Sequence, residues 1–154
     1  MGKAFIMVGL SGAGKTTAAH KVASVVCEAD HYMVNEAGQY SFDSSRLGEC
    51  HAKCFHAYVS ALQKGVETVA VANTNLSTEE IAPYLLAAQA YGYEPEIWLL
   101  HMDPKRAESR NLHGVPMETI LKQERHLQML PRLMPAHWGP FVHDIYESAR
   151  KKIS

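Results

Sequence analysis

The sequence lacks the long apolar runs that a membrane protein requires. Hydrophobic residues make up 47% of its 154 residues, but no run approaches the roughly 18 apolar residues that span a bilayer. The apolar stretch at the N-terminus leads into a glycine loop rather than a cleavage site, which indicates a core strand and not a signal peptide. We therefore expect an intracellular, cytoplasmic protein with no membrane partner, and one domain over residues 1–154.

Cysteine is scarce, and its three copies form an odd number without the spacing of a disulfide framework. This pattern favours a reduced, cytoplasmic setting. Cys50 and Cys54 lie one helical turn apart beside His51, an arrangement that would also suit a metal. The neighbouring apolar residues instead recur at helical spacing, so we predict that both cysteines belong to a packed core. Those neighbours are Leu47, Phe55, Tyr58 and Leu62.

A strong net charge is also missing, since the formal value is −1. Residues 1–100 hold six Lys/Arg against ten Asp/Glu, which gives −4, and residues 101–154 hold nine against six, which gives +3. A polyanionic partner is therefore not required, but if one binds we expect it to meet the C-terminal half. Chance scatter explains the asymmetry equally well.

Repeats, low-complexity tracts and linkers are absent, and strand and helix patterns alternate along the chain. Such alternation predicts an α/β fold with a parallel sheet that is covered by helices on both faces. Ligands of these sheets bind beyond the carboxyl ends of the strands. Strands are predicted at 3–9, near 27–30, at 66–72 and at 94–102; helices at about 15–26, up to about 64, from 78 to about 91, at 104–114 and at 116–130; the segment from 131 is weakly helical only in its last dozen residues.

Residues 9–16 read GLSGAGKT, a complete G-x-x-x-x-G-K-[ST] loop between a hydrophobic strand and a helix. The backbone N–H groups of such a loop cradle phosphates, while Lys15 can reach the β and γ groups and Thr16 can ligate Mg²⁺. We therefore predict a three-layer P-loop NTPase sandwich that binds ATP and Mg²⁺. Its cofactor-binding residues are predicted to be Gly9, Ser11, Gly12, Ala13, Gly14, Lys15, Thr16 and Thr17.

Asp30, at the end of the predicted second strand, is the candidate general base. Its carboxylate would face the phosphates and could accept the proton of an attacking hydroxyl. No other carboxylate is as well placed in the sequence, although a loop Asp that caps a turn is the structural alternative. We interpret Asp30, Lys15 and Arg110 as the catalytic residues.

A basic stripe follows the strand at 94–102. Arg106 and Arg110 are spaced i, i+4, and His113 is nearly in line with them. Such a stripe could form a helical lid over about 104–130 that closes on ATP and neutralises charge on the transferred group. The alternative is a solvated helix face with local ion pairs.

The strand at 66–72 ends in Asn73, Thr74 and Asn75, where ATP-driven motors carry acidic residues. The missing acid disfavours a hydrolytic motor. We predict that Asn73 and Thr74 offer neutral hydrogen bonds to a phosphate or acceptor. Asn75 would help turn the chain into a helix that Ser77 caps, with Glu80 completing a capping box.

In this order the loop, ADHY (29–32), NTNLSTEEIAPYLLAAQAYGY (73–93) and RNLHGVP (110–116) resemble the polynucleotide-kinase-like P-loop kinases, which include phage 5′-hydroxyl polynucleotide kinases. The resemblance covers residues 3–130. It implies that Asp30 is the general base for a 5′-OH, that Arg110 and the position of His113 form a lid over the γ-phosphate, and that DNA or RNA is the acceptor. At Asn73 the phage kinases carry Asp.

The chain departs from that family at three points. Met33 stands where phage kinases have an Arg that helps hold the acceptor's phosphate. His113 replaces an Arg, which makes the lid weaker or pH-dependent because imidazole is only partly charged near neutral pH. No phosphatase or ligase domain is attached, so we do not expect a complete end-healing enzyme. These departures leave room for a hydroxymethyl acceptor, such as 5-hydroxymethyluracil in phage DNA.

Three functions stay open. The favoured one is a kinase that transfers the γ-phosphate of ATP to a hydroxyl of a nucleic acid. The second is a small-metabolite kinase of the gluconate- or shikimate-kinase type, with a compact acceptor pocket lined by residues 31–46. The third is a non-catalytic nucleotide-binding module, or the ATPase part of a larger machine. The sequence makes no prediction of oligomeric state.

Overall fold

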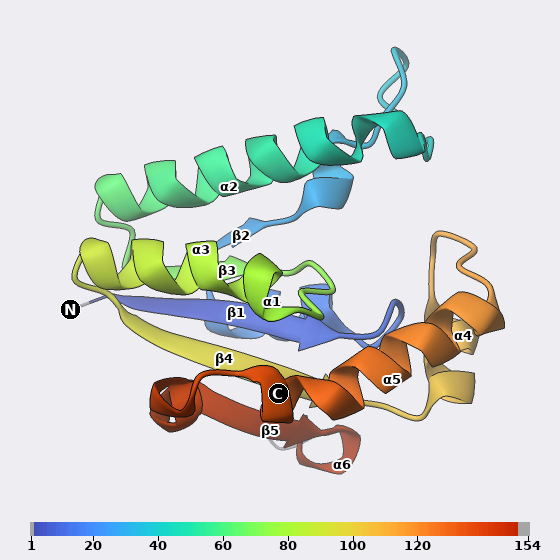
Figure 1. Cartoon of the computed structure of the whole chain (residues 1–154). Helices are drawn as coiled ribbons and strands as arrows, with labels where there is room; N and C mark the ends of the chain where they lie inside the picture. Colours follow the sequence, from blue (N-terminus) through green and yellow to red (C-terminus); the bar gives the residue numbers. More distant parts are fainter. Residues whose placement is uncertain (1, 151–154) are drawn as a thin grey trace.

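Five parallel strands form one sheet in the computed structural model, which describes residues 2–150 (Figure 1). The strand order is β2-β3-β1-β4-β5. The central strand β1 pairs in parallel with β3 on one side and with β4 along its whole length on the other. The strands are β1 (Lys3–Gly9), β2 (Val25–Cys27), β3 (Thr68–Val71), β4 (Glu94–His101) and β5 (Val142–Tyr146).

Helices cover both faces of this sheet, as the sequence predicted. Alternate residues of β1 point to opposite sides, so Ile6 and Val8 pack under α2, α3 and α5, whereas Phe5 and Met7 pack under α1. The three-layer α/β sandwich is thus confirmed. The helices are α1 (Lys15–Val22), α2 (Leu47–Gln63), α3 (Thr78–Ala90), α4 (Pro104–Arg110), α5 (Met117–Leu133) and α6 (Glu147–Arg150), with 3₁₀ turns η1 (Ala29–Tyr32), η2 (Ser44–Arg46) and η3 (Ala136–Phe141).

Cys50 and Cys54 are fully buried on the inner face of α2, which confirms that they belong to the core. The Cys54 sulfur lies 3.5 Å from the hydroxyl of Tyr84. Burial also raises the pKa of the Cys27 thiol to about 12, so this side chain stays protonated and behaves as a small apolar group.

Two boundaries at the start of the chain differ from the prediction. Helix α1 ends at Val22 rather than near residue 26, because Val25 and Val26 are already in β2, where they pair with Val69 and Ala70 of β3. The strand near 27–30 is therefore shifted toward the N-terminus. Asp30 consequently lies in the 3₁₀ turn η1 and not on the strand itself.

The tail from residue 131 holds an element that the sequence did not reveal. Helix α5 continues through Pro131 to Leu133, and Val142–Tyr146 then adds β5 to the edge of the sheet beside β4. Every residue of β5 is exposed or half-buried, so this strand lacks the buried apolar pattern of the inner strands. Within residues 2–150, no helix has the length and apolar content of a membrane span.

Candidate active site

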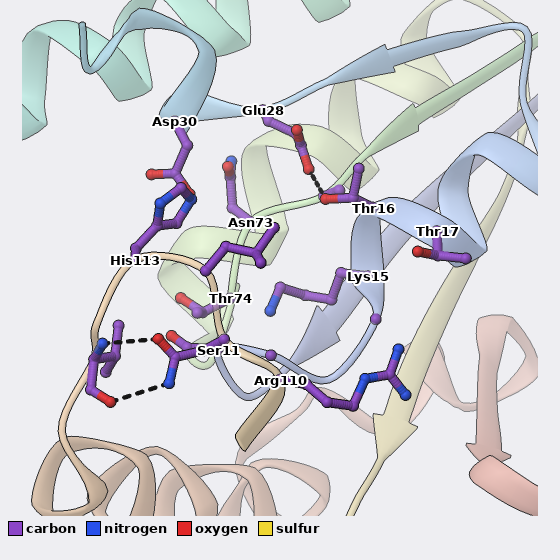
Figure 2. A pocket seen from close by; sticks show the side chains of 16 residues that line it. Ser11, Lys15, Thr16, Thr17, Glu28, Asp30, Asn73, Thr74, Arg110 and His113 are labelled. Carbon is purple, nitrogen blue, oxygen red and sulfur yellow. Dashed lines mark hydrogen bonds and ion pairs between the residues drawn. The ribbon is translucent and has the colours of Figure 1, made fainter. Parts of the chain in front are cut away.

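The loop between β1 and α1 forms one wall of a cleft of about 350 Å³ beyond the carboxyl ends of the strands, which we call the nucleotide-side cleft (Figure 2). Gly12 and Gly14 have φ values of +84° and +85°, the left-handed region that glycine adopts without strain. A Cβ on Gly12 would also lie 2.0 Å from the carbonyl oxygen of Ala107 in α4. Glycine is therefore required at Gly12 by conformation and by packing.

Lys15 lies at the start of α1 and folds back over this loop. Its Nζ donates to the carbonyl oxygens of Gly9, at 3.2 Å, and Leu10, at 2.6 Å. The ammonium group is thereby held beside the loop's amide groups and lines the cleft. A positive charge in this position suits the phosphates of a nucleotide.

Glu28 is a site residue that the sequence analysis missed. It directly follows β2 and is only 8% exposed. One carboxylate oxygen accepts from the hydroxyl of Thr16, and the other lies 2.6 Å from Nε2 of His31. The expectation that no carboxylate competes with Asp30 is therefore wrong, because Glu28 also lines the cleft and is in direct contact with the loop. The position of Glu28 directly after a short apolar strand is the sequence signal that could have identified it as a site residue.

The oxygen atoms of Thr16 and Glu28 fit a magnesium ion, which prefers hard oxygen ligands. Within residues 2–150, no group of three or more His, Cys, Asp or Glu side chains could hold a metal by itself. Magnesium typically keeps several waters and binds through one or two protein groups and substrate phosphates. A protein contribution from Thr16 is consistent with that mode.

Gln123 connects the loop between β1 and α1 to α5 by two hydrogen bonds. Its Oε1 accepts from the backbone N–H of Ser11 at 3.0 Å, and its Nε2 donates to the Ser11 hydroxyl at 3.1 Å. This two-way contact joins residues 112 positions apart, so no local pattern in the sequence could have revealed it.

Asp30 lies across the cleft from the loop and faces His113 (Figure 2). The His113 Nε2 is 3.4 Å from a carboxylate oxygen of Asp30. The imidazole also stacks on Tyr40, with ring centroids 3.9 Å apart and planes inclined by 23°. The segment between α4 and α5 thus contacts Asp30 through the side chain of His113.

Asn73 and Thr74 line the cleft, and each also accepts a hydrogen bond from the protein backbone. The Asn73 Oδ1 accepts from the backbone N–H of Ala29 at 2.9 Å, and Thr74 offers its carbonyl oxygen to the N–H of Gly9 at 3.0 Å. Asn73 therefore orients the residue next to Asp30. The predicted turn at Asn75 is present, with φ +50° and its side chain donating to Met7, and Ser77 caps α3 by accepting from the N–H of Glu80.

The two arginines of the predicted stripe have different surroundings. Arg110 lines the nucleotide-side cleft, whereas Arg106 is not one of the described residues around it. Arg106 pairs with Glu147 of α6 instead, and the same carboxylate lies 4.0 Å from the guanidinium of Arg110. The structure therefore brings Arg110 to the site and pairs Arg106 with α6.

A second cleft of about 470 Å³, the acceptor-side cleft, adjoins the first. Six residues line both clefts, and Asp30 and His113 are among them. The walls of the acceptor-side cleft come mainly from residues 40–51 and from the segment between α4 and the middle of α5. The lining comprises Ser11, Ala29, Asp30, Tyr40, Phe42, Leu47, His51, Asn73, Thr74, His113, Gly114, Val115, Pro116, Thr119 and Gln123.

The chain belongs to the AAA_33 family, described as an AAA domain, whose model matches residues 5–130. It is 31% identical to the human protein NEDD4-binding protein 2 over 134 residues, which are 80% of this chain and 7% of that protein. The chain thus spans a small fraction of this relative's length.

Two solved structures share the fold. A chain of the Pnkp1/Rnl/Hen1 RNA repair complex has a TM-score of 0.70 and 18% identity, covering 87% of this chain and 46% of that one. A gluconokinase from Sinorhizobium meliloti 1021 has a TM-score of 0.59 and 16% identity, covering 94% and 82%. These likenesses confirm the expected α/β P-loop kinase fold, and they do not identify the acceptor.

Proposed function

We propose that this protein is a kinase that transfers the γ-phosphate of ATP to a hydroxyl of a nucleic acid. The acceptor is the 5′-OH of DNA or RNA, or the hydroxymethyl group of a modified base such as 5-hydroxymethyluracil. The observation that carries the proposal is that Asp30 lines both clefts, so one carboxylate would face a nucleotide on one side and an acceptor on the other. The likeness in fold to a chain of an RNA repair complex also supports it.

On the nucleotide side the chain supplies positive charge and N–H donors. The loop amides and Lys15 would bind the β and γ phosphates, and Thr16 would hold magnesium, which when bound supplies charge neutralisation at the phosphates. Arg110 would stabilise the transferred group from the lid. Arg106 and Arg110 share one Glu147 carboxylate oxygen, which lies closer to Arg106 than to Arg110.

On the acceptor side Asp30 would act as the general base. The acceptor oxygen forms a bond to the γ-phosphorus, the bond from that phosphorus to the bridging oxygen breaks, and ADP leaves. The hydroxyl proton passes to the Asp30 carboxylate. The side chain of Asp30 is 57% exposed, so an acceptor can reach it, and His113 would cover the reacting groups from above.

A small acidic metabolite is the alternative acceptor. No lysine or arginine is among the described residues that line the acceptor-side cleft. A carboxylate such as that of gluconate would therefore meet only the imidazoles of His51 and His113 as cationic groups among these residues, and burying an unpaired charge is costly. This cleft suits an uncharged group that carries the hydroxyl.

The test is transfer of label from γ-labelled ATP to a panel of 5′-OH DNA and RNA oligomers, duplex with hydroxymethyluracil, and small polyols. We expect label in a polynucleotide, and in Asp30→Asn a fall in kcat of roughly 10²- to 10⁴-fold with unchanged affinity for ATP. Label only in polyols would contradict the proposal. ATP turnover that persists unchanged in Asp30→Asn would instead indicate a nucleotide-binding module.

A further inference from the structure

Exposed apolar side chains gather at the rim of the acceptor-side cleft. Tyr40, Phe42 and Leu47 are 37%, 62% and 40% exposed, and all three line this cleft. They come from one segment that runs from η1 to the start of α2. Leaving large apolar groups in water is unfavourable, and when they surround a cleft next to a reactive carboxylate they indicate a ligand with an apolar face.

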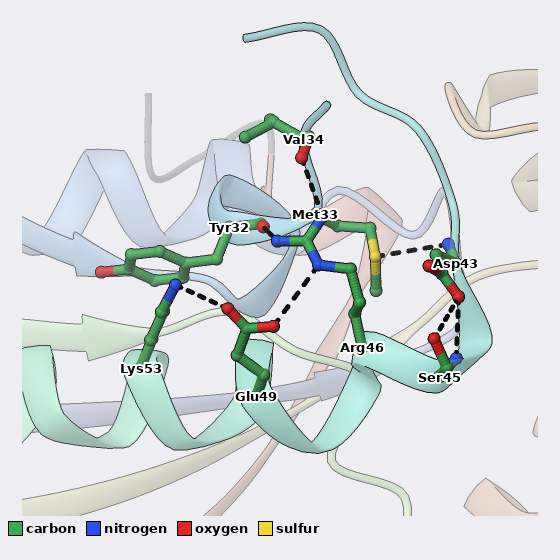
Figure 3. A network of polar contacts seen from close by, with 8 residues as sticks. All are labelled: Tyr32, Met33, Val34, Asp43, Ser45, Arg46, Glu49 and Lys53. Atoms are coloured by element: carbon green, nitrogen blue, oxygen red, sulfur yellow. Dashed lines mark hydrogen bonds and ion pairs between the residues drawn. The ribbon is translucent and has the colours of Figure 1, made fainter. Parts of the chain in front are cut away.

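The segment that carries these side chains is held firmly in place (Figure 3). Arg46 donates to the carbonyl oxygens of Val34, at 2.8 Å, and Tyr32, at 3.0 Å. Val34 also forms an antiparallel bridge with Tyr40. Tyr40 is therefore positioned before any ligand arrives, which lowers the entropic cost of binding.

Met33 lies inside this segment and not in the cleft. It is 2% exposed, and its sulfur accepts from the backbone N–H of Asp43 at 3.4 Å. The position at which the resembling kinases hold an acceptor phosphate with arginine is therefore a core position in this chain. Arg46, the nearby cation, is occupied by the two carbonyl oxygens that it binds.

The aromatic surface is uncharged. Burial, together with the charge of the nearby Asp30, raises the pKa of Tyr40, so its phenol stays protonated at neutral pH. Tyr40 already stacks against the planar ring of His113. Among the described residues no ring stacks on Phe42, which is the most exposed of the three.

We infer that Phe42 and Tyr40 bind the planar base of the acceptor's reacting nucleoside, so that the acceptor is selected by stacking and not by contacts to its phosphates. The inference rests on the proposed function and names the group recognised at the same site. Aromatic rings bind bases in this way with little sequence preference, because every base presents a π-face. Because both rings line the same cleft as Asp30, a base bound there would bring the hydroxyl of that nucleoside toward the general base.

The experiment compares two 3′-fluorescent oligomers, one with an ordinary 5′-OH nucleoside and one whose 5′-terminal nucleoside is abasic. Binding is measured with a non-hydrolysable ATP analogue present, for the unaltered protein and for Phe42→Ala, Phe42→Trp and Leu86→Ala. Leu86 is 61% exposed like Phe42 but lines neither cleft, so it is the matched control.

We expect Phe42→Ala to raise the Kd for the ordinary oligomer roughly tenfold and to leave the abasic one nearly unchanged. Phe42→Trp should retain binding, and Leu86→Ala should match the unaltered protein. Equal binding of the two oligomers by the unaltered protein, an equal loss for both in Phe42→Ala, or no binding of either would overturn the inference.

Transfer of label separates this result from the proposed function. If the base-dependent binding is found but no label enters the oligomer, the base site stands and the kinase proposal fails. If label enters ordinary and abasic oligomers equally well, the kinase proposal stands and the base site fails.

Discussion

The two clefts that meet at Asp30 are built from different chemistry. The nucleotide-side cleft consists of a contiguous loop with backbone N–H groups, Lys15 and a buried carboxylate. The acceptor-side cleft combines aromatic and apolar side chains with polar ones, and most of its lining comes from residues 40–51 and from the lid. Binding of phosphate needs a fixed pattern of donors, whereas recognition of an acceptor depends on the shape and polarity of side chains that differ between kinases.

After Asp30→Asn, the largest effect is expected from Lys15→Ala. This change removes the ammonium group from the nucleotide-side cleft, and loss of one such donor typically lowers kcat by about 10²- to 10³-fold. The loss should be the same for every acceptor, because Lys15 does not line the acceptor-side cleft. Steady-state rates with two different acceptors check this prediction. A loss confined to one acceptor would contradict the separation of roles between the two clefts.

A smaller effect is expected from Gln123→Ala, which removes both hydrogen bonds to Ser11. Each is worth about 1 kcal/mol and the two together about 2 kcal/mol, so the KM for ATP should rise by up to about thirtyfold as the loop loses its support. Gln128→Ala is the matched control, because Gln128 lies on the same helix and bonds only to Glu124 among the described residues. Equal KM values for the two variants would show that the loop holds its shape without α5.

The smallest effect is expected from Asn73→Asp. An aspartate keeps an oxygen that can accept from the N–H of Ala29, so activity should stay within about threefold of the unaltered protein. Asn73→Ala leaves that N–H unpaired and should lower activity further. Rates measured for both variants at saturating ATP decide the matter. If Asn73→Asp is as impaired as Asn73→Ala, the neutral amide itself is required next to Asp30.

Sequence reasoning succeeded for the fold because the information is local. The loop from Gly9 to Thr16 is one uninterrupted motif between an apolar strand and a helix, so the fold could be predicted, and nucleotide binding by its residues stays a prediction. The capping serine at Ser77 was found for the same reason, since its hydrogen-bond partner lies three residues away.

Sequence reasoning missed several features of the candidate site because they depend on contacts between residues that are far apart in the sequence. The pairing of Gln123 with Ser11 and the stacking of Tyr40 on His113 join residues that are far apart in the sequence. Strand β5 was missed because an exposed edge strand does not need an apolar pattern. Glu28 was overlooked because the strand was predicted two residues too late, which drew attention to Asp30 alone.

The six residues shared by the two clefts have a thermodynamic consequence. A ligand in either cleft would rest against side chains that also form the wall of the other, so we expect its presence to change the free energy with which the second ligand binds. Such coupling is reciprocal by necessity: whatever factor the nucleotide applies to the affinity of the acceptor, the acceptor applies to the nucleotide. His113 contacts both Asp30 and Tyr40, so we expect it to contribute most directly to this coupling between the two ligands.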